Sequence, residues 1–134
     1  MMIIRYKFII LAMMVFCHIV DDFYLQGVLA QLKQKEFWDG TEPRYNEDYK
    51  MALFAHGFSW SFVMSLPLLV CALITKSGEA LTVILCGYVI NTCWHVIIDD
   101  LKANQKKINL ITDQSLHLIQ VILFWVLVVN SINW

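Results

Sequence analysis

The sequence lacks any excess of positive charge. Its 134 residues include 10 lysines and arginines against 11 aspartates and glutamates, which leaves a formal net charge of -1. Proteins that bind nucleic acid need basic residues to neutralise phosphates, so this class is excluded. Internal repeats and low-complexity tracts are also absent. For a chain of this length we therefore expect a single domain over residues 1–134.

Cysteine motifs, a signal-peptide cleavage site and the pattern of barrel strands are missing as well. The four cysteines form no CxxC pair, so neither a disulfide framework nor a thiolate zinc site is expected. The first apolar segment follows Arg5 and Lys7 but carries no small-x-small cleavage site, so we interpret it as a retained helix rather than a signal peptide. No short runs of alternating polarity occur, which argues against the strands of a membrane β-barrel.

Apolar residues, in contrast, are abundant. They make up 59% of the chain, a larger share than soluble domains carry, and the mean hydropathy is +0.60. Four apolar segments approach or exceed the roughly 20 residues needed to cross a bilayer, at about 3–29, 51–74, 80–101 and 108–130. We therefore expect an all-α integral membrane protein, with the lipid bilayer as its partner surface.

The connections between these segments predict the topology. The charged stretch 31–50 is long, whereas 75–78 and 102–107 are tight turns, and short links make neighbouring helices antiparallel. The loops after the first and third helices carry Lys33, Lys35, Arg44, Lys50, Lys102, Lys106 and Lys107, against Arg5, Lys7 and Lys76 on the other side. The positive-inside rule then places loops 31–50 and 102–107 in the cytoplasm and both termini outside an inner membrane.

Ionisable side chains interrupt the apolar segments at one level. A charge at the bilayer centre costs about 2.5–3.5 kcal/mol, so such residues need compensation. The histidines and aspartates concerned are His18, Asp21, Asp22, His56, His95, Asp99, Asp100, Asp113 and His117. In an antiparallel four-transmembrane-helix bundle they all fall in the half of the membrane beside loops 31–50 and 102–107. We predict an intramembrane His/Asp cluster near that face.

Three pairs in this set share a spacing of one helical turn, namely His18 with Asp22, His95 with Asp99, and Asp113 with His117. This spacing puts an imidazole and a carboxylate on one helix face, where together they can chelate a divalent ion. Metal binding would also offset the cost of burying the charges. The predicted ligands are His18, Asp22, His56, His95, Asp99, Asp113 and His117. Zinc is the leading candidate, with manganese or iron as alternatives, since His and Asp suit all three.

Neighbouring polar residues are expected to support these ligands. Gln26 and Gln114 are interpreted as hydrogen-bonding partners that orient ligand side chains. Asp21 and Asp100 point about 100° away from the ligand faces, which favours an orienting or interfacial role for each. Lys102 is expected at the interface, where it could meet an anionic headgroup.

Three of these segments resemble the signature motifs of a protein family. The segments “HIVDDFYLQ”, “HVIIDDLK” and “DQSLH” are similar to the H-x-x-G-D-F-x-x-Q, H-x-x-x-D-x-x-K and D-Q-x-x-H motifs of domain-of-unknown-function family 3307, small multi-helix membrane proteins of bacteria and phages. The resemblance covers three of the four helices and implies the same ligand faces. It also leads us to expect a small residue where Asp21 stands and a second histidine near Ala52.

The first functional hypothesis is a metal-dependent hydrolase that acts on a lipid or phosphoester at the cytoplasmic leaflet. The His/Asp pattern is also similar in arrangement to that of inner-membrane metal-dependent hydrolases. Asp113 or Asp21 would serve as the general base. One alternative is a metal-ion or proton-coupled transporter, which would need a homo-oligomer because four helices are few for a pathway. The other is a non-catalytic interaction protein with a structural His/Asp centre, whose loop 31–50 binds a partner.

Overall fold

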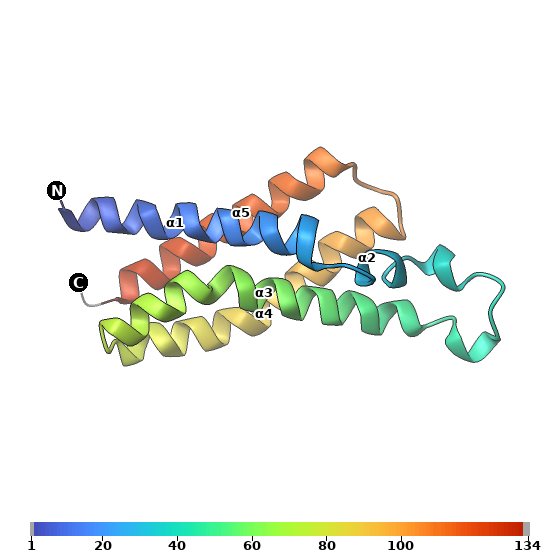
Figure 1. Cartoon of the computed structure of the whole chain (residues 1–134), viewed down its shortest axis with the longest axis horizontal. Helices are drawn as coiled ribbons and strands as arrows, with labels where there is room; N and C mark the ends of the chain where they lie inside the picture. The colour runs from blue at the N-terminus through green and yellow to red at the C-terminus, as the bar shows by residue number, and fades with distance from the viewer. Residues whose placement is uncertain (1, 133–134) are drawn as a thin grey trace.

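Four long helices form an antiparallel bundle in the computed structural model, which describes residues 2–132 (Figure 1). They are α1 (Met2–Val20), α3 (Asp48–Ile74), α4 (Gly78–Ala103) and α5 (Leu110–Ser131). No strand occurs in this described part of the chain. Four candidate spans, one on each of these helices, are long and apolar enough to cross a membrane. The predicted helical class and the number of apolar segments are confirmed.

The two lysine-rich connections lie at the same end of the bundle. In Figure 1 the chain runs away from the N-terminus along α1 and returns along α3, then repeats this course along α4 and α5. Residues 26–47 and 104–109 therefore meet at the end opposite the termini, which we call the loop end. The end of α1, the start of α3, the end of α4 and the start of α5 share one level beside it.

The first helix departs from the prediction, which continued it to residue 29. The α-helix ends at Val20 and passes into a π-helical turn, η1 (Asp21–Leu25), in which the Gln26 N–H donates to the Asp21 carbonyl at 3.1 Å. Gly27 then adopts a φ of +48°, a conformation that glycine tolerates, and the chain turns away. Three short helical turns lead on to α3, namely α2 (Leu29–Leu32), η2 (Lys35–Trp38) and η3 (Pro43–Tyr45).

The first connection is tied to the turn between α4 and α5. The Lys35 backbone N–H donates to Asn104 Oδ1 at 2.6 Å, and Asn104 Nδ2 donates to the Lys33 carbonyl at 3.2 Å. Lys106 forms an ion pair with Glu36 next to them. These contacts hold residues 33–36 across the loop end, although the two segments are some seventy residues apart in sequence.

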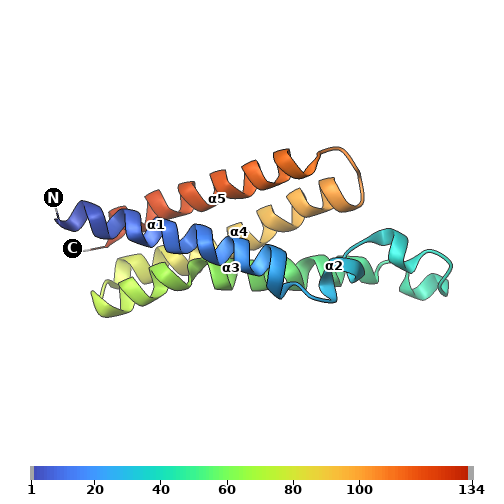
Figure 2. The ribbon, with the colours of Figure 1, turned by 45° about the horizontal axis from the view of Figure 1, so that its top comes forward.

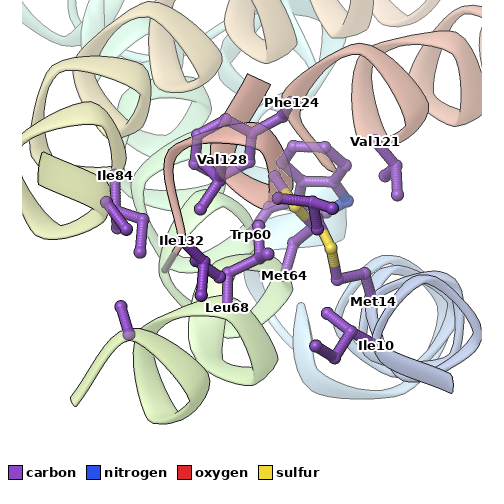
Figure 3. Close-up of a cluster of buried hydrophobic side chains, with 13 residues drawn as sticks. Ile10, Met14, Trp60, Met64, Leu68, Ile84, Val121, Phe124, Val128 and Ile132 are labelled. Atoms are coloured by element: carbon purple, nitrogen blue, oxygen red, sulfur yellow. The ribbon is translucent and has the colours of Figure 1, made fainter. Parts of the chain in front are cut away.

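An apolar core fills the half of the bundle nearer the termini. Side chains from all four long helices meet there, as Figure 3 shows for Ile10, Met14, Trp60, Met64, Leu68, Ile84, Val121, Phe124, Val128 and Ile132. All ten are buried. The buried histidines and aspartates of residues 2–132 lie outside this core, so the interior is divided into an apolar half and a polar half.

Gly57 allows α3 and α4 to pack closely where His56 and His95 face each other. A Cβ atom at this position would lie 2.8 Å from Val96 Cγ2 and 3.2 Å from the Thr92 carbonyl oxygen. Both distances are shorter than ordinary van der Waals contact, so a larger side chain would push the two helices apart.

Replacing Gly57 by alanine is expected to lower the free energy of unfolding by about 1–2 kcal/mol. Overpacking costs about 1–3 kcal/mol, which exceeds the gain of up to about 1 kcal/mol from the better helix propensity of alanine. Thermal unfolding in detergent measures the change. Gly78→Ala is the matched control, because a Cβ there meets nothing within 4 Å. Equal Tm values for the two variants would contradict the packing argument.

Candidate metal centre

Six buried side chains converge at the loop end of the interior. They are Asp22 on η1, His56 on α3, His95 and Asp99 on α4, and Asp113 and His117 on α5, and none is more than 5% exposed. They form two candidate metal-binding groups that share Asp22, and within each group the ligand atoms lie within 4.8 Å of one another. We call these six residues the His/Asp centre. The cluster expected from the antiparallel topology is therefore present.

The first group consists of Asp22, His56, His95 and Asp99. His56 Nε2 lies 3.2 Å from Asp22 Oδ1 and 3.2 Å from His95 Nε2. Asp99 Oδ2 lies 3.4 Å from His56 Nε2 and 3.8 Å from His95 Nε2. Two imidazole nitrogens and two carboxylate oxygens from three different helical elements thus face a common point.

The second group consists of Asp22, Asp113 and His117. His117 Nε2 lies 3.5 Å from Asp113 Oδ1, as the predicted spacing of one turn implies, and 3.4 Å from Asp99 Oδ1. Asp99 therefore faces the first group with one carboxylate oxygen and His117 with the other. Its carboxylate links the two groups.

The donor set fits a divalent metal ion. Three imidazole nitrogens and three carboxylates are ligands that zinc, manganese and iron all accept. The facing Nε2 atoms of His56 and His95 repel each other through their lone pairs unless a proton or a cation lies between them. Buried carboxylates need positive partners. Lysines pair with Asp99 and Asp113, whereas Asp22 faces the imidazole of His56, which leaves room for a cation. The centre could therefore hold a metal ion in either group.

A stack of aromatic rings fixes two of the histidines. The indole of Trp60 stacks on His95 with ring centroids 4.3 Å apart, and His95 stacks on His117 at 4.1 Å, with interplanar angles of 23° and 24°. Trp60 is completely buried and also belongs to the apolar core. The stack therefore anchors the polar half of the interior to the apolar half and limits rotation of both imidazoles.

His18, which was also predicted as a metal ligand, lies beside the His/Asp centre and belongs to neither group. Its Nδ1 accepts a hydrogen bond from Trp60 Nε1 at 2.8 Å. Because an indole N–H can only donate, the neutral His18 ring carries its proton on Nε2. The π-helical turn begins between His18 and Asp22, so the two residues do not keep the relation that a regular α-helix would give them.

The π-helical turn also brings Asp21 into the interior, where a regular helix would have turned it away. Asp21 is completely buried next to Asp22. Its Oδ1 accepts a hydrogen bond from Ser59 Oγ at 2.9 Å, and its Oδ2 lies 3.9 Å from His56 Nδ1. Asp21 thus lies beside Nδ1 of His56, whereas Nε2 of the same ring points into the His/Asp centre. At 3.9 Å Asp21 Oδ2 and His56 Nδ1 form no hydrogen bond, so Asp21 can support a metal-binding imidazole through its charge.

Replacing Asp21 by asparagine is expected to weaken metal binding about 10–100-fold, the usual effect of losing a residue that orients a ligand. Competition with a fluorescent chelator measures the affinity. Ser59→Ala, which removes only the hydroxyl that holds Asp21, should change the affinity in the same direction and by less. An unchanged affinity in Asp21→Asn would show that His56 does not depend on Asp21.

Two lysines reach carboxylates of the centre. Lys33, which is only 8% exposed, places Nζ 2.5 Å from Asp99 Oδ2. Lys102 Nζ lies 2.7 Å from Asp113 Oδ2 and is partly exposed. Both ammonium groups approach from the loop end, so the centre has a cationic side that faces the lysine-rich connections.

The two glutamines have different roles. Gln114 Nε2 donates to Asp22 Oδ2 at 2.6 Å and to Asp113 Oδ2 at 2.9 Å, so it orients two ligand carboxylates. Gln26 Nε2 donates to the backbone carbonyl of Asp22 and so supports the π-helical turn instead. Only Gln114 contacts ligand carboxylates as predicted.

Asp100 lies away from the centre. Its carboxylate accepts hydrogen bonds from Asn104 Nδ2 and Gln105 Nε2, both at 2.8 Å. It therefore closes the end of α4 onto the following turn. Of the two roles considered for Asp100, the structure favours this interfacial one.

Three contributing residues were not predicted, namely Lys33, Ser59 and Trp60. Ser59 and Trp60 follow His56 by three and four residues, which places them on the same helix face, so this spacing was a usable signal. Lys33 carried no such signal, because it lies in an irregular connection and reaches Asp99 only through the tertiary fold.

Comparison with known proteins identifies the family of the chain. A protein-family model matches residues 10–134, and its description is “Protein of unknown function (DUF3307)”. This match confirms the resemblance seen in the three motifs. No curated protein and no solved structure matches the chain.

Proposed function

Because the chain belongs to the DUF3307 family of proteins of unknown function, we propose its activity from the His/Asp centre itself: a membrane-embedded, metal-dependent hydrolase that acts on a lipid or phosphoester. The observation that carries the proposal is the pair of overlapping, fully enclosed ligand groups at one end of four apolar helices. Buried charge of this kind in such helices is expensive and is typical of functional sites.

The first group would hold one ion through Asp22, His56, His95 and Asp99, and the second group could hold another. A bound divalent ion supplies a Lewis acid that polarises a phosphoryl or acyl oxygen and makes water a better nucleophile. The aromatic stack keeps the imidazole of His95 in position, and the Asp21 carboxylate lies 3.9 Å from the Nδ1 atom of His56.

Asp113 is the general base in this proposal. Its Oδ2 is held by Lys102 and Gln114, whereas its Oδ1 accepts no hydrogen bond and faces His117 at 3.5 Å. With the first group occupied, Asp113 Oδ1 would take the proton of the attacking water. The Lys102 and Gln114 contacts would keep the carboxylate from rotating during this transfer.

The lysines favour an anionic substrate. Ammonium groups are common partners of phosphate, and Lys33 and Lys102 both lie on the loop-end side of the centre. They would neutralise a phosphate on binding and the charge that develops in the transition state. The lysine-rich connections favour a cytoplasmic location for the loop end, so a lipid phosphate of that leaflet is the substrate we propose.

Transport is the less favoured function. A pathway would need polar side chains through both halves of the bundle. Beyond the centre, Gln120 Nε2 donates to the Asn91 carbonyl and to Asn91 Oδ1, both at 2.8 Å. The interior then continues as the apolar core shown in Figure 3. A polar centre confined to one half of the bundle fits catalysis better than passage.

The test combines metal content with turnover. Protein purified without chelator should contain zinc, manganese or iron in elemental analysis. It should also release phosphate or fatty acid from a panel that includes phosphatidic acid, p-nitrophenyl phosphate and acyl esters. EDTA should abolish turnover, and adding back the metal should restore it. Metal-loaded protein that turns over no compound of the panel would reject the hydrolase.

A further inference from the structure

A groove opens on the outside of the bundle between α1 and α5, close to the His/Asp centre. The two helices diverge toward the loop end, as both Figure 1 and Figure 2 show. The groove has a volume of about 450 Å³ and is lined by Val15, His18, Ile19, Phe23, Tyr24, Gln114 and Leu118. It faces outward from the bundle, on a side that would be in contact with lipid.

The floor of the groove is polar and connects to the centre. His18 is only 1% exposed and lines the groove together with Gln114. Gln114 in turn donates to Asp22 and Asp113, which are ligand candidates of the second group. A polar group bound at His18 would therefore be one side chain away from the proposed metal ligands.

The walls and rim of the groove are apolar and open to the outside. Ile19 is 42% exposed, Phe23 53% and Tyr24 77%, and Leu118 lines the opposite wall. In a membrane these side chains would contact acyl chains. A larger hollow of about 560 Å³ between α1 and α3 has an almost wholly apolar lining, and no residue of the centre lines it. Unlike that hollow, the groove between α1 and α5 combines apolar walls with a link to the centre.

We propose that this groove binds a lipid phosphate, with a hydrocarbon chain along the apolar walls and the phosphate at His18. The inference rests on the proposed function, because it identifies the route by which the substrate would reach that same site. The apolar walls select a lipid over a water-soluble phosphoester. The Nε2–H of neutral His18 would donate to the phosphate, because both N–H bonds of Gln114 are already donated to Asp22 and Asp113.

Photolabelling tests the route independently of turnover. Protein reconstituted in phosphatidylcholine vesicles would be irradiated with phosphatidic acid that carries a diazirine in one acyl chain, and the labelled residues would be mapped by mass spectrometry. Labels are expected at the groove residues Val15, Ile19, Phe23 and Leu118. Diacylglycerol with the same diazirine should label these positions more weakly, because it lacks the phosphate.

Leu118→Trp should fill the groove and reduce this labelling by about tenfold. A tenfold loss of lipid affinity corresponds to about 1.4 kcal/mol of binding free energy. Leu123→Trp is the matched control, since it makes the same change on the exposed surface of α5 without lining the groove. Val15→Trp on the other wall provides a second blocking variant should Leu118→Trp fold poorly.

Groove labelling without any turnover would support the route and reject the hydrolase. Labelling spread evenly over the lipid-facing surface, or unchanged in both blocking variants, would overturn the route even if the protein hydrolyses phosphatidic acid.

Discussion

Asp22→Asn is expected to lose metal from both ligand groups, and hydrolytic turnover with it, because Asp22 belongs to both. The free energy of zinc binding to a four-ligand site is roughly 10–16 kcal/mol, so each ligand contributes on the order of 3 kcal/mol. Losing one ligand should therefore weaken metal binding by at least about 100-fold. Asparagine keeps the shape of the side chain but removes the negative charge. The measurements are metal content per chain and turnover of phosphatidic acid.

Asp100→Asn is the matched control for this change. Asp100 is also a helix-terminal aspartate, but its hydrogen bonds go to Asn104 and Gln105 rather than to the centre. It should therefore retain the metal content of the wild type. Both variants should elute from size-exclusion chromatography like the wild type, which separates loss of metal from loss of fold. Wild-type metal content in Asp22→Asn would show that this residue is not a ligand.

Trp60→Ala is expected to have the largest effect on stability. Removing a fully buried tryptophan costs about 3–5 kcal/mol, and Trp60 is completely enclosed in the apolar core. The change would also remove the ring against which His95 stacks and the donor bound to His18. We therefore expect a lower Tm together with weaker metal binding, measured by thermal unfolding with and without added zinc.

Two further variants separate the roles of this side chain. Trp60→Phe keeps an aromatic ring beside His95 but leaves His18 Nδ1 without its donor, which costs about 1–3 kcal/mol. Metal binding should be weakened less than in Trp60→Ala. Trp125→Ala removes a tryptophan that contacts the ring of Phe8 in a tilted arrangement and donates to the Lys7 carbonyl. It should lower stability and leave metal affinity unchanged, and a similar loss of affinity there would refute a specific role for Trp60.

The fold was accessible from the sequence because its determinants are local. Hydropathy over about twenty residues identifies each long helix, and the short turn at 75–77 forces antiparallel neighbours. The level of the cluster follows from topology alone. For this reason His56, His95, Asp99, Asp113 and His117 were expected together before any contact was known, and they lie together in the structure.

The departures have a common physical cause, because each depends on a conformation that side-chain spacing does not encode. The π-helical turn changes the direction of Asp21 and Asp22 relative to His18, and a helical wheel of 3.6 residues per turn cannot represent it. Lys33 reaches Asp99 only because the first connection is held across the loop end. Helix periodicity therefore predicts which faces are polar, and irregular backbone decides which side chains reach the centre.

The distribution of the two ligand groups along the chain also sets the order in which they can form during synthesis. Asp22, His56, His95 and Asp99 are all synthesised by the end of α4, whereas Asp113 and His117 belong to α5 and follow later. The first group therefore does not require α5, which adds its residues to a partly built centre. A protein truncated before α5 would retain the first group without the stack partner His117 or the base Asp113, which makes the last helix the step that completes the enzyme we propose.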